Sequence, residues 1–191
     1  GLEGLLLHRQ HLLSGIRNGI DTDAWDPRRD PYLPAPFSAS NLDGKQAAKQ
    51  EVLARFGLPV DAAALARPLI GMVTRLVDQK GLDLIRGARE ALTRMEAAFV
   101  VLGTGERANE EMWREMAAEC PTRIGVQVGF DERLAHLIEG GADLFLMPSR
   151  FEPCGLNQMY SMRYGTVPVV RATGGLVDTV QPFDPRTGDG T

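Results

Sequence analysis

From residue 69 onward, short apolar segments alternate with segments of helical periodicity, and this alternation constrains the fold more than any other feature of the chain. Strand character is found in residues 69–74, 97–103, 125–129, 142–148 and 167–171. Helical segments lie between them, over residues 80–95, 108–119, 131–140 and 155–165. Strands that are apolar on both faces and joined by helices form parallel sheets covered on both sides. The sequence therefore predicts an α/β fold, a Rossmann-like doubly wound parallel sheet.

The chain before the sheet divides into two parts. Residues 1–20 are expected to form a helix and then a short strand at 15–20. Residues 26–45 are rich in Pro, Ser, Asp and Asn and lack periodicity, which indicates a surface connection, and a helix over 45–57 follows. The first segment begins without a helix cap and the last ten residues stop in a turn-rich stretch, so truncation at both ends is expected.

Composition narrows the class of function. The 191 residues carry a net charge of −4, whereas a nucleic-acid or acidic-membrane surface requires a basic excess. The sequence lacks an apolar stretch that could cross a bilayer and a signal-peptide layout at its start, so a cytoplasmic protein is expected. The two cysteines favour no disulfide framework, and the three histidines favour no metal site. The histidines are predicted to be exposed on helices.

Candidate functional residues lie in the loops that follow the strands, because ligands of open α/β sheets bind at the carboxyl ends of the strands. In the segment RLVDQK, Arg75 and Lys80 place two cations where the next helix begins. Cations at a helix N-terminus are unfavourable unless an anion occupies the space between them, so this loop indicates an anion site. The alternative is that both side chains are solvated or paired with Asp78 or Asp83.

Two further loops supply glycine amides and a carboxylate. In ATGGL, Gly174 and Gly175 allow a turn whose N–H groups, above a helix N-terminus, point towards a phosphate, although a plain tight turn fits as well. In SRFEPCG, Pro153 favours an extended Glu152 at the sheet edge, where it would contact sugar hydroxyls. Helix capping by Glu152, or pairing with Arg150, is the alternative. Together the loops suit a diphosphate joined to a sugar.

Two other features of the sequence are weaker indications of function. The segment GTGERA (103–108) resembles a dinucleotide fingerprint, but it follows the second strand of the sheet, and no acidic residue ends the next strand to hold a ribose. A NAD-dependent oxidoreductase domain therefore stays an alternative. Cys154 has no histidine nearby in the sequence, which favours a small packing residue over a nucleophile.

The segments RLVDQKGLDL, SRFEPCGLNQMYSMRYGTVPVV and TGGLVDTV, in this order and spacing, resemble the C-terminal domain of bacterial glycogen synthases, the ADP-glucose-dependent members of the starch and glycogen synthase family. GLEGLL and NGIDTDAWDP near the start resemble the interdomain region of that family. The resemblance implies one half of a GT-B glycosyltransferase. It divides the chain into an interdomain or hinge segment (1–25), a surface connection with a helix (26–67) and a Rossmann-like nucleotide-sugar-binding domain (68–191), truncated at its C-terminus.

The resemblance also implies roles for individual residues. Arg75 and Lys80 match the basic pair at the donor diphosphate, and Glu152 matches the carboxylate at the donor glucose. The other matched donor-binding positions are Asn18 in the hinge, Phe130 where relatives carry a tyrosine against adenine, and Cys154, Gly155, Leu156, Thr173, Gly174 and Gly175. Tyr160 stands where the wider superfamily often has a second glutamate, so a ribose-binding carboxylate is not carried over.

The implied reaction transfers glucose from ADP-glucose to the non-reducing 4-hydroxyl of an α-1,4-glucan, with retention at the anomeric carbon. The residues leave open whether ADP-glucose is preferred to UDP-glucose. No metal or other cofactor is expected, because the protein supplies the positive charge. The acceptor side of the cleft belongs to an N-terminal domain that this sequence lacks, so the chain by itself is expected to bind ADP weakly and to transfer no glucose. A non-catalytic nucleotide-binding module remains a further alternative.

Overall fold

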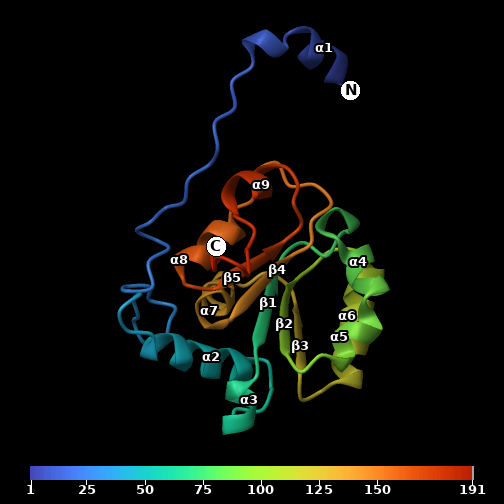
Figure 1. Cartoon of the computed structure of the whole chain (residues 1–191). Helices are drawn as coiled ribbons and strands as arrows, with labels where there is room; N and C mark the ends of the chain where they lie inside the picture. The colour runs from blue at the N-terminus through green and yellow to red at the C-terminus, as the bar shows by residue number, and fades with distance from the viewer. Residues whose placement is uncertain (191) are drawn as a thin grey trace.

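The computed structural model describes residues 1–190, and residue 191 lies outside the described part of the chain. At its centre is a five-stranded parallel sheet with the order β3-β2-β1-β4-β5 (Figure 1). The strands are β1 (Leu69–Val73), β2 (Ala98–Gly103), β3 (Ile124–Val128), β4 (Leu144–Met147) and β5 (Val167–Val170). From the β1–β4 junction the chain continues to one side through β2 and β3 and to the other through β5. The chain after β1 leads to α4 (Leu82–Gly87) and the chain after β4 leads to α8 (Asn157–Arg163), on opposite faces of the sheet, and this reversal is where a crevice is expected.

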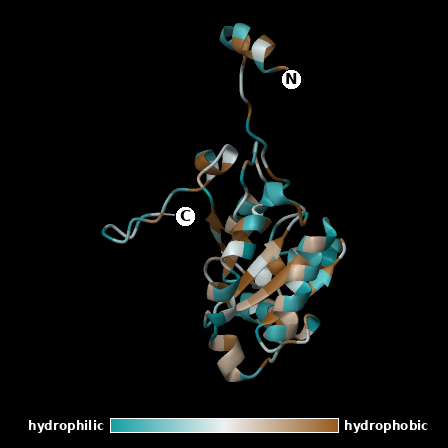
Figure 2. Ribbon diagram, turned by 90° about the vertical axis from the view of Figure 1, so that its right-hand side faces the viewer, coloured by the Kyte–Doolittle hydropathy of each residue, from teal (hydrophilic) through white to brown (hydrophobic). Residues whose placement is uncertain are grey.

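Helices cover both faces of the sheet, as the sequence predicts. On one face lie α2 (Asp43–Arg55), α7 (Glu132–Gly141) and α8 (Asn157–Arg163), and on the other lie α4 (Leu82–Gly87), α5 (Arg89–Arg94) and α6 (Arg107–Glu119) (Figure 1). Side chains of β2 alternate between the two cores. Val100 packs into the core with α2 and α7, whereas Phe99 and Val101 pack with Trp113 and Met116 of α6. Figure 2 shows the hydrophobic strands enclosed between helices whose outer faces are hydrophilic.

Two predicted elements differ from the structure. The helix expected over 80–95 is divided into a 3-10 turn η2 (Asp78–Lys80), α4 and α5, with a break at Ala88 directly after Gly87. Glycine is a poor helix former, and a prediction from the spacing of apolar residues takes no account of it. The strand expected at 15–20 is wrong. Residues 13–20 are irregular and run outside the sheet, where no neighbouring strand among the described residues is available for pairing (Figure 1).

The remaining short elements are α1 (Glu3–His8), the 3-10 turn η1 (Gln10–Leu12), α3 (Ala62–Ala66) and α9 (Gly175–Thr179). Residues 1–19 are exposed throughout and extend away from the sheet (Figure 1). In the described part of the chain, no helix combines the length and the apolar character needed to cross a bilayer. The division of the chain at residues 25 and 67 stays a prediction.

The surface connection, together with Trp25 directly before it, packs on α7 and α8. Trp25 lies between the rings of His136 and Tyr160, with ring centroids 3.6 and 3.7 Å away and nearly parallel planes. Asp30 is buried and accepts hydrogen bonds from His136 Nδ1 (2.8 Å) and the Tyr164 hydroxyl (2.5 Å). His136 is therefore only 3% exposed, and the prediction of an exposed histidine is wrong. Helical periodicity in α7 contains no information about a segment that packs on it from elsewhere in the chain.

Candidate functional site

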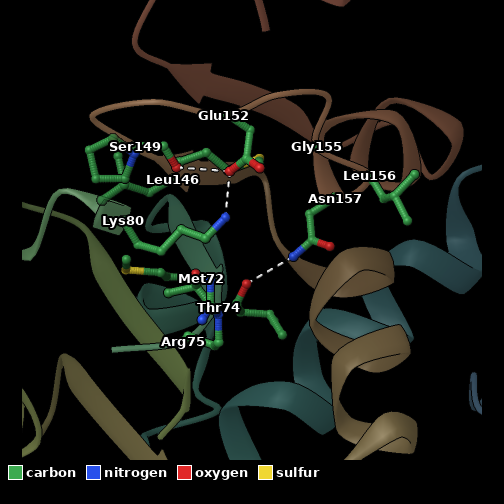
Figure 3. A pocket seen from close by; sticks show the side chains of 13 residues that line it. Met72, Thr74, Arg75, Lys80, Leu146, Ser149, Glu152, Gly155, Leu156 and Asn157 are labelled. Atoms are coloured by element: carbon green, nitrogen blue, oxygen red, sulfur yellow. Dashed lines mark hydrogen bonds and ion pairs between the residues drawn. The ribbon is translucent and has the colours of Figure 1, made fainter. Parts of the chain in front are cut away.

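A pocket of about 370 Å³ opens at the carboxyl ends of β1 and β4, where the strand order reverses (Figure 3). Arg75 follows β1, Lys80 ends η2, and Glu152 lies in the loop between β4 and α8, and all three line this pocket. Gly81, next to Lys80, has a φ of +79°, and a Cβ there would lie 2.1 Å from the Pro148 carbonyl oxygen. Only glycine lets the loop after β1 approach the end of β4 so closely. The predicted catalytic residues thus converge on one crevice.

The Glu152 carboxylate is held from two sides. Lys80 Nζ lies 2.5 Å from Glu152 Oε2, and the Ser149 hydroxyl donates to the same oxygen over 3.2 Å (Figure 3). Glu152 is 8% exposed and Ser149 is 1% exposed. A carboxylate buried to this extent requires a cation or hydrogen-bond donors nearby. Lys80 therefore pairs with Glu152, and its alternative pairing with Asp78 or Asp83 is wrong.

Arg150 pairs with a different partner. Its guanidinium contacts the Asp83 carboxylate through Nε (3.0 Å) and Nη2 (2.6 Å), and this hydrogen bonding lowers the pKa of Asp83. The bidentate contact ties the loop after β4 to the start of α4. The alternative that Glu152 pairs with Arg150 is therefore wrong. Arg75 is exposed at the pocket, with its Nη2 atom 3.5 Å from Gln79 Oε1, so its charge faces solvent.

The glycine turn, residues 173–175, packs directly behind Glu152. Gly174 has φ +49° and ψ −134°, a conformation that is essentially restricted to glycine. A Cβ on Gly174 would lie 2.2 Å from the Glu152 carbonyl oxygen. The Gly175 amide donates to that same oxygen over 2.9 Å. The turn therefore supports the backbone of Glu152, and the Gly175 amide, predicted to face a phosphate, is occupied internally. The helix that follows, α9, has five residues and contributes little dipole.

A second pocket of about 220 Å³ adjoins the first. The two pockets share Val73, Thr74 and Arg75, and Phe130, which is 85% exposed, lines the second one. An exposed aromatic ring is a platform on which a planar base can stack. Sequence reasoning places Phe130 near a base through the resemblance alone, whereas the structure shows the apolar pocket beside it.

The GTGERA segment has a structural explanation. A Cβ at Gly103 would lie 1.9 Å from the Thr74 carbonyl oxygen, and one at Gly105 would lie 2.5 Å from the Leu76 carbonyl oxygen. Leu76 also exchanges backbone hydrogen bonds with Thr104 and Glu106, both of 2.9 Å. The glycines therefore let the loops after β1 and β2 lie against each other. This packing accounts for the pattern without a dinucleotide.

The chain is similar in sequence to known proteins. The model of a family described as "Glycosyl transferases group 1" matches residues 60–188. The chain belongs to this family. It is 57% identical over 183 residues to the glycogen synthase of Anaeromyxobacter dehalogenans (strain 2CP-1), covering 96% of this chain and 38% of the relative. The glycogen synthase of Alkalilimnicola ehrlichii is 54% identical over 192 residues, covering 100% of this chain and 40% of the relative.

A solved structure supports the same assignment. The catalytic domain of starch synthase IV from Arabidopsis thaliana, bound to ADP and acarbose, is 40% identical and superposes with a TM-score of 0.85. The alignment covers 97% of this chain and 38% of that protein. The chain thus spans less than half the length of the relatives it matches. The predicted fold, a Rossmann-like half of a GT-B glycosyltransferase, is confirmed, and so is the resemblance to bacterial glycogen synthases.

Some of the other predicted donor-binding residues of this group 1 glycosyl transferase line the first pocket, and others do not. Gly155, with φ +75°, and Leu156 line the first pocket. Cys154 is half-buried, with its backbone against Gly175, and Thr173 Oγ1 lies 3.4 Å from the Arg150 carbonyl oxygen. Asn18 is exposed in the extended N-terminal segment and stands outside both pockets as formed by residues 1–190, so its role at the donor sugar stays a prediction.

Sequence reasoning missed three polar residues that line the pocket of this glycosyl transferase, Thr74, Ser149 and Asn157. Ser149 bonds Glu152, and the Asn157 amide donates to the Val73 carbonyl oxygen at the end of β1 over 2.8 Å (Figure 3). Both lie in the segment SRFEPCGLN, so their proximity to Glu152 was the available signal. Tyr160, at the position where the wider superfamily often has a second glutamate, stacks on Trp25 and helps to hold the start of the surface connection on α8.

Proposed function

We propose that the chain is the donor-binding half of a retaining glucosyltransferase that moves glucose from ADP-glucose to the non-reducing end of an α-1,4-glucan. One observation carries the proposal. Two cations, Arg75 and Lys80, and one carboxylate, Glu152, surround a pocket that continues into an apolar pocket beside Phe130. The arrangement has the order of the parts of a sugar nucleotide: a sugar near Glu152, a diphosphate at the cations and a base beside the aromatic ring. The glycogen synthase relatives and the starch synthase bound to ADP and acarbose support the proposed reaction and donor.

The chemistry follows from where negative charge develops. Departure of ADP builds charge on the phosphate oxygen that leaves the anomeric carbon. Cations fixed at that oxygen stabilise the transition state more than the ground state, and this difference accelerates the reaction. Arg75 is free to approach such an anion, and Lys80 is already oriented towards the pocket by Glu152. We propose that these side chains supply the positive charge without a metal ion, and that the acceptor glucan is held by the part of the relatives that lies outside this chain.

The test uses a chimera in which this chain replaces the matched segment of the A. dehalogenans glycogen synthase. The chimera is expected to incorporate labelled glucose from ADP-glucose into glycogen, and the chain alone is expected to bind ADP without transferring glucose. Lys80→Ala or Arg75→Ala should each lower turnover about 100-fold, the usual effect of removing one transition-state donor. Arg94→Ala, which removes an exposed arginine paired with Glu90 on α5, is the matched control and should leave turnover unchanged.

Other outcomes would point elsewhere. Calorimetric titration of the chain with ADP, UDP and NADH separates the alternatives, because a dinucleotide-dependent oxidoreductase domain would bind NADH in preference to ADP. Tighter binding of UDP would revise the donor but keep the reaction. A folded chimera that binds ADP but makes no glucan would indicate a non-catalytic nucleotide-binding module. Full activity of the chimera carrying Lys80→Ala would contradict the role of that cation.

A further inference from the structure

Two loops of the candidate site are joined by a closed circuit of partly buried hydrogen bonds. One is the carboxylate elbow, residues 152–155, which presents Glu152. The other is the glycine turn, residues 173–175, which precedes α9. They are separated in the sequence by the whole of α8 and β5. Direct contacts between them include the Gly175 amide on the Glu152 carbonyl oxygen, the close approach of Gly174 to the same atom, and Gly175 against the backbone of Cys154.

The circuit is completed by Gln158 of α8 and Thr179 of α9. Gln158 Nε2 lies within hydrogen-bond distance of the carbonyl oxygens of Cys154 (3.0 Å) and Gly155 (3.1 Å) and of Thr179 Oγ1 (3.0 Å), so one of its two N–H groups is shared between two acceptors. The Thr179 hydroxyl in turn donates to the Gly175 carbonyl oxygen over 2.8 Å. One amide group thus bonds the elbow on one side and the helix that follows the glycine turn on the other.

The direction of these bonds is fixed by their partners. Two of the three atoms that face Gln158 Nε2 are backbone carbonyl oxygens, which accept only, so the amide must present its N–H groups to them. Thr179 has one hydroxyl hydrogen, which the Gly175 carbonyl oxygen takes, and its oxygen can then accept from Gln158. Donation therefore runs in one sense from the Gln158 amide through Thr179 to Gly175. A side chain of the same shape without N–H groups would leave these partly buried carbonyl oxygens without a donor from residue 158.

The cost of keeping Gln158 indicates that it does more than fill space. Its side chain is fully buried, and within residues 1–190 its Oε1 atom has no hydrogen-bond partner. A buried polar atom without a partner is unfavourable, so an apolar side chain of equal size would satisfy packing better. Gly155 also accommodates it, because a Cβ there would lie 2.5 Å from Gln158 Oε1. The structure thus accepts one unpaired oxygen to place N–H donors between the two loops.

We propose that Gln158 and Thr179 are positioning residues that lock the carboxylate elbow and the glycine turn into one rigid unit. The inference rests on the proposed function, because that function places the Glu152 carboxylate at the donor sugar. In the pocket formed by residues 1–190, neither side chain belongs to the wall, so their effect on the donor is indirect. Their bonds fix the Glu152 carboxylate, which the proposed function places at the sugar, relative to the backbone of Gly174 and Gly175.

The primary test is turnover of the chimera with substitutions at Thr179. Thr179→Val keeps the shape and removes the hydroxyl, and it should lower kcat about 10-fold, because loosening of catalytic geometry by a fraction of an ångström is costly. Thr179→Ser restores the hydroxyl and should restore kcat. Thr93→Val is the matched control, since the Thr93 hydroxyl makes the same kind of bond, to the Glu90 carbonyl oxygen on α5, far from the site. Thermal melts verify that each variant is folded.

The circuit also predicts how the substitutions combine. Gln158→Met fills the same space without donors and should lower kcat by about as much as Thr179→Val. Because both variants open one circuit, the double variant should be no worse than the more damaging single variant. Losses that multiply, or Thr179→Val with wild-type kcat in an active chimera, would overturn the proposal while leaving the proposed function intact.

A second measurement on the chain itself does not depend on activity. Amide hydrogen exchange at Gly175, whose N–H bonds the Glu152 carbonyl oxygen, reports how firmly the elbow and the turn are joined. Thr179→Val and Gln158→Met should each speed exchange at Gly175 about 10-fold, and Thr93→Val should not. An unchanged exchange rate would refute the locking role even if the chimera proved inactive. Activity of the chimera therefore tests the proposed function, and exchange at Gly175 tests the positioning role of Gln158 and Thr179 independently of it.

Discussion

Gly174→Ala provides a sharp test of the idea that the glycine turn supports Glu152. The added methyl would lie 2.2 Å from the Glu152 carbonyl oxygen, whereas real Cβ contacts essentially never fall below 3.0 Å. The oxygen, or the turn, must therefore move by roughly 1 Å, and a displacement of that size in a catalytic group can cost about 100-fold in rate. In addition, the φ of +49° and ψ of −134° cost an alanine about 1–3 kcal/mol of stability.

A matched control separates these two effects. Gly57 also has a positive φ, +68°, but a Cβ there would meet nothing within 4 Å. Gly57→Ala should therefore lower the melting temperature through the backbone cost alone and leave turnover unchanged. The assay is incorporation of labelled glucose into glycogen by the chimera, measured below the melting temperature of both variants. If Gly174→Ala retained the turnover of Gly57→Ala, the argument that the turn fixes the Glu152 backbone would be refuted.

Two further predictions concern the base pocket and a buried carboxyl group. Phe130→Ala should weaken ADP binding to the chain about 10-fold in calorimetry, as expected for one lost stacking contact, while Phe183→Ala, which removes another exposed ring, should not. Complete burial raises the pKa of Glu139 well above 4.5, so its contribution to stability is present below pH 4.5 and is lost as the pH rises from there. Glu139→Gln should therefore raise the melting temperature at pH 8 but not at pH 4.5, and Glu132→Gln, on the exposed side of α7, should change neither. Equal melting temperatures of wild type and Glu139→Gln at pH 8 would contradict the assignment.

Much of the fold was predictable because its signals are local. The apolar strands and the periodic helices between them specify a parallel sheet, and the carboxyl ends of parallel strands always lie at one edge. That rule alone predicts that Arg75, Lys80, Glu152 and Gly174 lie near one another. The same local reasoning failed over residues 15–20, where apolar residues resembled a strand but no partner strand in the described chain accompanies them.

The alternatives that stayed open in the sequence concerned pairing between distant segments. Arg150 and Lys80 each had several acidic neighbours, and the choice of Asp83 for one and Glu152 for the other depends on how the loops after β1 and β4 meet. The burial of His136 likewise depends on a connection that crosses α7 from elsewhere in the chain.

The sequence by itself thus determined the order of strands and helices, the chemical groups at the sheet edge and the relationship to group 1 glycosyl transferases. Only the tertiary structure decided which cation holds Glu152, that Tyr160 serves Trp25, and that Gln158 and Thr179 connect the two loops. The physical reason is that periodicity and turn chemistry act over a few residues along the chain. Hydrogen bonds and ion pairs between loops instead depend on strand register and on approaches of a few ångströms, which many local arrangements would permit and one packed core selects.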